Sequence, residues 1–345
     1  MEKSGIKCVV WDLDHTLWEG VLLEDPEVRI KPEVVEAIRT LDSRGILHSI
    51  ASKNDRETAL HKLEALGLAE YFLAPEIGWG AKSESVKRIA ASLNLGIDAL
   101  AFVDDQPFER EEVATTHPAV WCVDAADAAS LVDAPRCTPR MITSDARQRR
   151  SMYRADLLRK EEEERFDGPS EAFLAGLEMR LRISPAAEED LTRAEELTVR
   201  TNQLNATGIT YGYDELDAYR RSADHALLMA ELHDRFGTYG KIGLVLLEKG
   251  ATRWTIKLLL MSCRVMSRGV GNILLAHVMS RAKDHGAELV ADFVHTGKNR
   301  MMFVAYRFAG FTEAGEAGGV VKLAHALDKI PAFPPYVRVE VDEGS

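Results

Sequence analysis

The sequence lacks long apolar runs, paired cysteines and an excess of positive charge. No uninterrupted apolar run approaches the length that crosses a membrane, so a membrane-spanning protein is not expected. The four cysteines, at positions 8, 122, 137 and 263, form no CxxC pair, which predicts reduced thiols and a cytoplasmic location. The net charge of -12 disfavours nucleic acid and anionic membranes as partners.

The length of the chain and its changes in composition indicate two domains. The chain has 345 residues, more than most single cores hold. We expect one domain at residues 1–144, a charged helical linker at 145–175, a second domain at 176–333 and a C-terminal tail at 334–345. The charges of 145–167 favour a solvated helix over the alternative, a partner-binding segment. Five of its arginines, at 147, 149, 150, 154 and 159, are a candidate docking patch for an acidic partner.

In the first domain, short apolar segments alternate with helix-like segments. Expected strands cover residues 7–11, 46–52, 99–105 and 120–124, and expected helices cover 31–45, 54–67 and 82–93. This alternation predicts a parallel Rossmann-like α/β sheet with helices on both faces. In such sheets, ligands bind outside the carboxyl ends of the strands. The functional site of this domain is therefore expected at that edge.

The second domain has a different pattern. Residues 179–184 alternate like a half-exposed strand, and three further expected strands, at 225–235, 241–250 and 253–263, have short connections. Short connections predict an antiparallel meander. A helix at 272–286, a strand at 288–295, a helix at 299–310 and a final strand follow. The second domain is therefore expected to be a mixed α/β fold.

Two pairs of acidic residues lie at the ends of apolar strands in the first domain. Asp12 and Asp14 follow the strand at 7–11, and Asp104 and Asp105 end the strand at 99–105. Because side chains alternate along an extended chain, we expect Asp12 and Asp14 to point the same way. Two buried anions on one face repel each other, so such a pair is tolerated when a cation lies between them. These oxygen ligands favour Mg²⁺.

Ser52 and Lys82 complete the groups that phosphoryl transfer requires. Ser52 ends the strand at 46–52, and Lys82 opens the helix at 82–93. An enzyme that moves a phosphoryl group needs a nucleophile, a divalent cation, a group that holds phosphate oxygens and a fixed positive charge. The alternative roles are an ordinary hydroxyl at a strand end and an exposed charge on a helix.

The motif Asp-x-Asp-x-Thr at 12–16, followed by Ser52, Lys82 and the acidic pair at 104–105, resembles the haloacid dehalogenase (HAD) superfamily. The resemblance implies that Asp12 is the nucleophile that becomes an aspartyl-phosphate. It implies that Asp14 is the acid and base, and that its backbone carbonyl also binds the metal. The implied Mg²⁺ ligands are Asp12, Asp14, Asp104 and Asp105, and the implied phosphate-binding residues are Thr16, which orders the turn, Ser52 and Lys82.

The second domain resembles the GNAT acyltransferase fold. Residues 298–311, with Asn299, Tyr306 and Gly310, resemble the last helix of that fold and its turn. Residues 267–272, SRGVGN, lie where GNAT proteins hold a pyrophosphate on backbone N–H groups at a helix N-terminus. Part of the usual glycine pattern is present, so this loop is expected to hold a protein-bound phosphopantetheine arm rather than coenzyme A.

Cys263 closes the expected strand at 253–263, directly before that loop. A thiol at this place can form an acyl-thioester, because the positive end of the following helix favours thiolate. The alternative is a buried structural cysteine. The stretch 201–208, TNQLNATG, is rich in side-chain amides, which bind polar ligands or cap turns. The candidate substrate-binding residues of this domain are Asn202, Asn205, Arg264 and Arg268.

Five stretches across nearly the whole chain resemble the FkbH family: WDLDHTLWEGVLLED, DDQPFER, TNQLNATG, DRFGTYGKIG and MSCRVMSRGVG. That family joins a HAD domain to a GNAT-like domain and makes glyceryl-acyl carrier protein from 1,3-bisphosphoglycerate, for methoxymalonyl or tetronate units in polyketide biosynthesis. The resemblance implies a bifunctional glyceryl transferase and phosphatase with Cys263 as a catalytic thiol and an acyl carrier protein as partner. Residues 20–31 leave little room for a cap domain, which suits a bulky or protein-borne substrate.

Three other functions fit parts of the sequence. A HAD phosphatase of a small metabolite, whose second domain recognises the substrate, predicts that Cys263→Ala leaves turnover intact. A non-enzymatic docking module for carrier proteins predicts a decayed phosphatase site, and the intact motif residues disfavour it. Acetylation that depends on acetyl-coenzyme A would require binding of coenzyme A.

Overall fold

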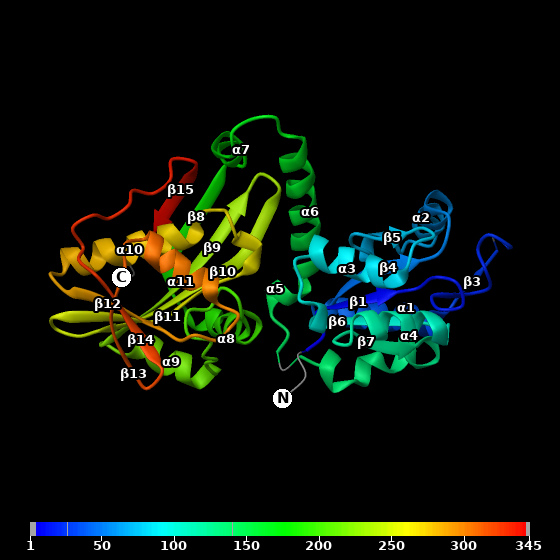
Figure 1. Ribbon diagram of the computed structural model, residues 1–345, viewed down its shortest axis with the longest axis horizontal. Helices are drawn as coiled ribbons and strands as arrows, with labels where there is room; N and C mark the ends of the chain where they lie inside the picture. Colours follow the sequence, from blue (N-terminus) through cyan, green and yellow to red (C-terminus); the bar gives the residue numbers. More distant parts are fainter. Residues whose placement is uncertain (1–4, 26, 140, 343–345) are drawn as a thin grey trace. The chain divides into compact units, whose positions relative to one another are not determined.

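The computed structural model describes residues 5–25, 27–139 and 141–342 of the chain (Figure 1). The chain divides into two compact units between Glu161 and Glu162. This division lies inside the segment predicted as a linker, near the C-terminal end of helix α6 (Arg149–Arg165).

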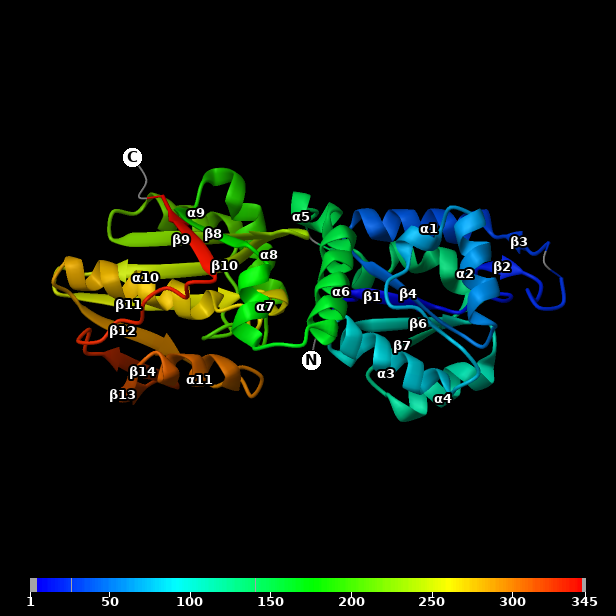
Figure 2. The same ribbon diagram turned by 90° about the horizontal axis from the view of Figure 1, so that it is seen from above.

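The first unit is built on a five-stranded parallel sheet. The strands lie in the order β5 (Glu76–Ile77), β4 (Leu47–Ser52), β1 (Cys8–Trp11), β6 (Leu100–Asp104) and β7 (Trp121–Asp124). Figure 2 shows helices α1 (Pro32–Ser43) and α2 (Arg56–Ala65) on one face, and α3 (Lys82–Ser92) and α4 (Pro107–Thr116) on the other. All four residues of β1 are buried, as expected for a central strand covered on both faces.

The connection between β1 and α1 is a short antiparallel pair rather than a domain. It consists of β2 (Trp18–Glu19) and β3 (Arg29–Ile30). This agrees with the expectation that residues 20–31 leave little room for a cap.

The charged segment after the sheet forms α5 (Ser144–Arg147) and α6. Of the five arginines in the candidate docking patch, Arg149 and Arg159 are buried, whereas Arg147 and Arg154 are exposed, so docking through this segment stays a prediction. Arg149 is buried and donates to the Gly45 carbonyl oxygen at 3.1 Å. The guanidinium of Arg150 contacts the Asp42 and Glu70 carboxylates at 3.0 and 2.9 Å.

The second unit is built on an eight-stranded mixed sheet. Its strands lie in the order β13 (Thr312–Ala317), β14 (Val320–His325), β12 (Glu288–Phe293), β11 (Arg253–Met261), β10 (Gly237–Lys249), β9 (His225–Asp234), β8 (Met179–Pro185) and β15 (Val337–Val341). Strands β8 to β11 pair antiparallel in sequence order, which confirms the predicted meander, whereas β12 joins β11 in parallel. The predicted final strand is a hairpin of two strands, β13 and β14.

Helices cover both faces of this sheet. Residues of α8 (Leu191–Arg200) and α9 (Tyr213–Arg221) belong to one hydrophobic cluster with the sheet. Residues of α7 (Ser170–Gly176), α10 (Val270–Asp284) and α11 (Arg300–Phe308) belong to a second cluster with the sheet. The predicted architecture, a parallel sheet with helices on both faces followed by a mixed α/β domain with an antiparallel meander, is confirmed.

Part of the predicted C-terminal tail is a strand. Residues 337–341 form β15 and pair in parallel with β8, from Val337 opposite Met179 to Val341 opposite Ile183. Valine at every second position, 337, 339 and 341, is typical of a strand, although charged residues separate the three valines. Residues 343–345 of the predicted tail lie outside the described residues.

No helix within the described ranges is both long enough and apolar enough to cross a membrane. All four cysteines are free, as their spacing predicted.

His48 in β4 is fully buried in the first unit, where its ring hydrogen-bonds to Trp11 and Ile38. Its Nδ1 accepts from the Trp11 indole at 3.0 Å, and its Nε2 lies 3.0 Å from the Ile38 carbonyl oxygen. Burial lowers the pKa of His48 from 6.5 to about 3, and the hydrogen bond to Ile38 offsets this in part. The folded protein therefore keeps a neutral imidazole at pH values where the unfolded chain is protonated.

Acidification is expected to destabilise the protein through His48. Between pH 6.5 and about 3 the unfolded chain binds a proton that the folded chain does not, so stability falls as pH falls. The free energy of unfolding should drop by about 1 kcal/mol between about pH 7 and about pH 5.5 from this group alone. Urea unfolding followed by tryptophan fluorescence measures it, since four of the five tryptophans lie before residue 162. An equally steep pH dependence in His48→Gln would contradict the assignment.

Candidate active site

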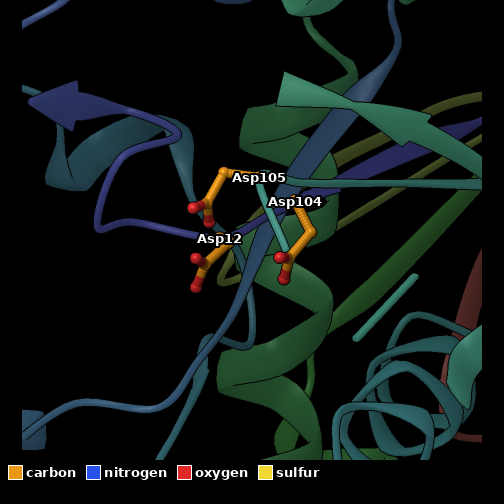
Figure 3. Close-up of side chains that lie close together, drawn as sticks. All are labelled: Asp12, Asp104 and Asp105. Carbon is orange, nitrogen blue, oxygen red and sulfur yellow. The ribbon is translucent and has the colours of Figure 1, made fainter. Parts of the chain in front are cut away.

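Three carboxylates meet at the carboxyl edge of the parallel sheet (Figure 3). Asp12 follows β1, Asp104 ends β6, and Asp105 comes next in the chain. One oxygen of each lies within 4.8 Å of the others. Asp12 is held in place by its backbone N–H, which donates to the Val103 carbonyl oxygen of β6 at 2.9 Å. Three of the four predicted metal ligands therefore lie close enough together to hold one ion.

Lys82 places a positive charge beside this cluster. Its ammonium lies 2.8 Å from the Asp12 carboxylate and also contacts Asp104. Lys82 is the first residue of α3, and its side chain is 5% exposed, so it is not the exposed helix charge considered as its alternative. Ser52, at the end of β4, is buried and hydrogen-bonds to the Asp12 carboxylate. The sheet edge thus brings five predicted residues together: Asp12, Ser52, Lys82, Asp104 and Asp105.

The cluster carries more negative charge than its surroundings favour. Burial raises the pKa of Asp12 and of Asp104, and Lys82 only partly offsets this. Burial and the charge of Asp104 also raise the pKa of Asp105. Burial opposes the charge of Lys82, but the nearby carboxylates outweigh it and raise the pKa of the ammonium.

These residues fit a divalent cation. Three carboxylates and one ammonium leave two negative charges, which one divalent cation balances. The Asp105 Oδ1 atom is buried and has no hydrogen-bond partner among the described residues, although buried acceptors are nearly always paired. Carboxylate oxygens are the ligands that Mg²⁺ prefers, so the cluster is a site for Mg²⁺.

Asp14 does not join the cluster through its side chain. Its carboxylate accepts from the Trp18 indole at 2.7 Å, the Asn54 amide at 3.0 Å and the Leu22 backbone at 3.1 Å. The turn of the chain covers residues 15–17, after Asp14, and the expectation that Asp14 points the same way as Asp12 stays a prediction. The roles predicted for Asp14 as acid and base, and for its backbone carbonyl as a metal ligand, stay predictions.

Sequence reasoning missed Trp18 and Asn54, the two side chains that hold Asp14. Asn54 follows the Ser52 strand end by two residues, and this proximity was the available signal. Thr16, in the same turn as Asp14, is fully buried, and its hydroxyl has no partner among the described residues. Its predicted contribution to phosphate binding stays a prediction.

In the second unit, Cys263 lies in the turn between β11 and α10. Strand β11 ends at Met261, and Cys263 begins a 3₁₀ turn, Cys263–Val265. The thiol is half-buried, so it is not the fully buried cysteine considered as its alternative. The Ser262 N–H donates to the Ile242 carbonyl oxygen at 2.7 Å, which fixes this turn to β10.

The predicted phosphate-binding loop leads directly into α10. Gly269 caps this helix with a φ of 79°, a left-handed conformation that suits glycine. Arg268 is 7% exposed and donates to Glu163 at 3.1 Å, while its Nε and Nη1 have no partner among the described residues. Arg264 donates to the Ser262 hydroxyl at 3.4 Å.

The amide-rich loop has an internal structural role. Asn205 is fully buried, its Oδ1 accepts from the backbones of Thr207 and Gly208, and its Nδ2 donates to Ile209. These bonds use the amide within the loop itself. Asn202 is exposed on the same segment. Binding of substrate by these two residues stays a prediction.

No protein-family model matches the chain. A human protein, magnesium-dependent phosphatase 1, is 29% identical over 136 residues, which make up 34% of this chain and 76% of the human protein. A crystal structure of the N-terminal part of a Bacteroides fragilis protein, containing a phosphatase domain complexed with Mg, is 28% identical with a TM-score of 0.34. That alignment covers 38% of this chain and 40% of that chain, so this chain spans about two fifths of it.

The second unit is similar to acetyltransferase structures. The ribosomal-protein-S18-alanine N-acetyltransferase from Escherichia coli aligns with 16% identity and a TM-score of 0.33, over 42% of this chain and 92% of that chain. A putative phosphinothricin N-acetyltransferase aligns with 18% identity and a TM-score of 0.32, over 43% of this chain and 99% of that chain.

Addition of Mg²⁺ to protein treated with a chelator is expected to raise the thermal unfolding midpoint by about 5 °C or more at saturation, because binding to the folded state stabilises it. Asp105→Asn should lose most of this shift, since it removes the charge whose buried oxygen lacks a partner. The exposed Asp133→Asn serves as the control. Calorimetry measures the shift, and an undiminished shift in Asp105→Asn would place the cation elsewhere.

Proposed function

We propose that this chain is a bifunctional glyceryl transferase and phosphatase. It moves the acyl group of 1,3-bisphosphoglycerate to an acyl carrier protein and removes the remaining phosphate with the help of Mg²⁺. The observation that carries the proposal is the buried cluster of Asp12, Asp104 and Asp105 beside Lys82, in one chain with a GNAT-like domain. The five FkbH-like stretches support the combination of activities. Similarity to a human magnesium-dependent phosphatase supports the phosphatase activity.

Asp12 is the nucleophile of the phosphatase step. A carboxylate oxygen of Asp12 attacks the phosphorus of the C3 phosphate, the bond from phosphorus to the glyceryl oxygen breaks, and Asp14 donates a proton to that oxygen. Water then loses a proton to Asp14 and attacks the aspartyl-phosphate, which releases inorganic phosphate and regenerates Asp12. Lys82 binds the phosphoryl oxygens in both steps. Mg²⁺, when bound by the carboxylates, supplies charge neutralisation for the phosphoryl group.

Cys263 is the nucleophile of the acyl-transfer step. C1 of the substrate is a mixed anhydride, so transfer to sulfur requires positioning rather than ATP. The thiolate attacks the C1 carbonyl, the bond from that carbon to the phosphate oxygen breaks, and inorganic phosphate leaves. The pantetheine thiolate of the carrier then attacks the enzyme thioester, the bond from the acyl carbon to the Cys263 sulfur breaks, and the Cys263 thiolate is regenerated. The buried Nε and Nη1 of Arg268, which have no hydrogen-bond partner among the described residues, suit phosphate oxygens of the substrate or the arm.

A phosphatase of a small phosphorylated metabolite is the second candidate function. It is favoured by the human relative, whose alignment covers 34% of this chain, close to the size of the first domain. In this case the second unit recognises the substrate and Cys263 forms no covalent bond.

Intact-protein mass spectrometry of the carrier separates the two candidates. The enzyme, Mg²⁺, 1,3-bisphosphoglycerate generated in situ and a carrier with its pantetheine arm are mixed, and a carrier without the arm is the control. We expect a glyceryl mass on the armed carrier. Release of phosphate with an unloaded carrier would contradict acyl transfer and support the second candidate.

A further inference from the structure

Two large aromatic side chains are exposed next to the phosphatase site. Trp79 is 69% exposed and precedes Lys82 by three residues, and Phe108 is 72% exposed and follows Asp105 by three residues. Trp79 therefore lies in the loop that leads to Lys82, and Phe108 lies in the first turn of α4, shortly after Asp105. Exposed aromatic side chains that gather at one place are more informative than single ones.

Contacts between α3 and α4 bring the two segments together. The Ser83 N–H of α3 donates to the Glu112 carboxylate of α4 at 3.0 Å, and the Ser83 hydroxyl contacts the same carboxylate. His117 at the end of α4 lies 3.1 Å from the Ser83 carbonyl oxygen. Phe108 lies one helical turn before Glu112 on α4 and is exposed to solvent. Trp79 is separated from Lys82, the first residue of α3, by two residues.

The position of these aromatic residues determines which part of a substrate they can contact. Asp12, Ser52 and Lys82 are buried and fix the phosphoryl end. The rest of the substrate must extend from the carboxyl edge of the sheet toward solvent, past the loops that carry Trp79 and Phe108. Uncharged aromatic faces and edges favour apolar groups and sulfur. Free phosphoglycerate offers a hydrated carboxylate there, whereas a glyceryl thioester offers sulfur and the methyl and methylene groups of its arm.

We propose that Trp79 and Phe108, here named the aromatic rim, bind the thioester sulfur and pantetheine arm of a carrier-bound 3-phosphoglyceryl group. This inference rests on the proposed function and deepens it by assigning the phosphatase substrate. Acyl transfer then precedes dephosphorylation, because the phosphatase site selects the thioester over the free acid. The short β2–β3 connection, which is no cap domain, is consistent with a protein-borne substrate.

Phosphate release from two synthetic probes tests the rim. The probes are 3-phosphoglyceryl-S-pantetheine and free 3-phosphoglycerate, and both are supplied directly, so the result does not depend on Cys263. We expect the wild type to show a kcat/KM about tenfold or more higher for the thioester. The ratio of the two kcat/KM values should fall about tenfold in the Trp79→Ala/Phe108→Ala double variant. Trp79→Phe should retain much of the ratio, and Phe308→Ala, an aromatic 86% exposed in the second unit, should not change it.

Each other result overturns the inference in a distinct way. An unchanged ratio in the double variant would exclude the rim and leave the proposed function standing. Faster hydrolysis of a nucleoside monophosphate, with the same loss in the double variant, would assign the rim to a planar base. Release from neither probe would overturn the proposed phosphatase function together with the rim. Thermal unfolding of the double variant should match the wild type, since both side chains are exposed.

Discussion

Asp12→Asn is expected to lower Mg²⁺-dependent phosphate release from 3-phosphoglyceryl-S-pantetheine by about 10⁴-fold or more, because an amide cannot form the aspartyl-phosphate. The variant should still load the carrier, so the mass on the carrier becomes that of a phosphoglyceryl group. This accumulation follows from the separation of the two steps: the carboxylate acts on the C3 phosphate, and Cys263 acts on C1.

Phosphate release is measured with 3-phosphoglyceryl-S-pantetheine, which has no C1 phosphate, and the mass on the carrier is measured in a parallel reaction with 1,3-bisphosphoglycerate. Asp133→Asn makes the same chemical change at an exposed carboxylate and should behave like the wild type. Circular dichroism should show a folded Asp12→Asn protein, because burial already disfavours the charge at this position and raises the pKa of the carboxyl group. A glyceryl mass from the variant at the wild-type rate would mean that Asp12 is not the nucleophile.

Cys263→Ala is expected to reduce carrier loading by more than about 10³-fold, because no other thiol lies in the turn between β11 and α10. Hydrolysis of 3-phosphoglyceryl-S-pantetheine should continue, since this probe bypasses acyl transfer. The enzyme itself should lose the mass of the covalent acyl group.

Cys122→Ala is the matched control. Cys122 is also half-buried, but burial raises the pKa of its thiol to about 11, so it is a weak nucleophile at neutral pH. Loading by this variant should equal that of the wild type. Full loading by Cys263→Ala would show direct transfer to pantetheine without an enzyme thioester.

The sequence predicts the elements that form the phosphatase site because their signals are strong and local. Continuous apolar runs predict β1, β4 and β6, and the rule that ligands gather at the carboxyl edge places Asp12, Ser52 and Asp104 together. The structure has all three at that edge. The predicted meander depends on equally local signals, namely long apolar strands with short turns.

Features that depend on tertiary context are not predicted. Strands β2, β3 and β5 have two residues each, too few for a periodic signal. The Asp14 carboxylate bonds to Trp18 and Asn54 instead of joining the three clustered carboxylates, and alternation along a strand does not predict these partners. The charges of α6 predict a solvated helix, yet Arg149 and Arg159 are buried. Arg149 bonds to Gly45 in a distant segment, and Arg159 bonds to Asp156 in the same helix.

The pairing of β15 with β8 has a consequence for synthesis on the ribosome. Strand β8 belongs to the start of the second unit, and its partner β15 is made about 160 residues later. Until residues 337–341 emerge, one edge of β8 has no strand beside it, and such an open edge pairs readily with other chains. Completion of this sheet is therefore a late event, and a nascent chain stalled before Pro334 would be prone to aggregate.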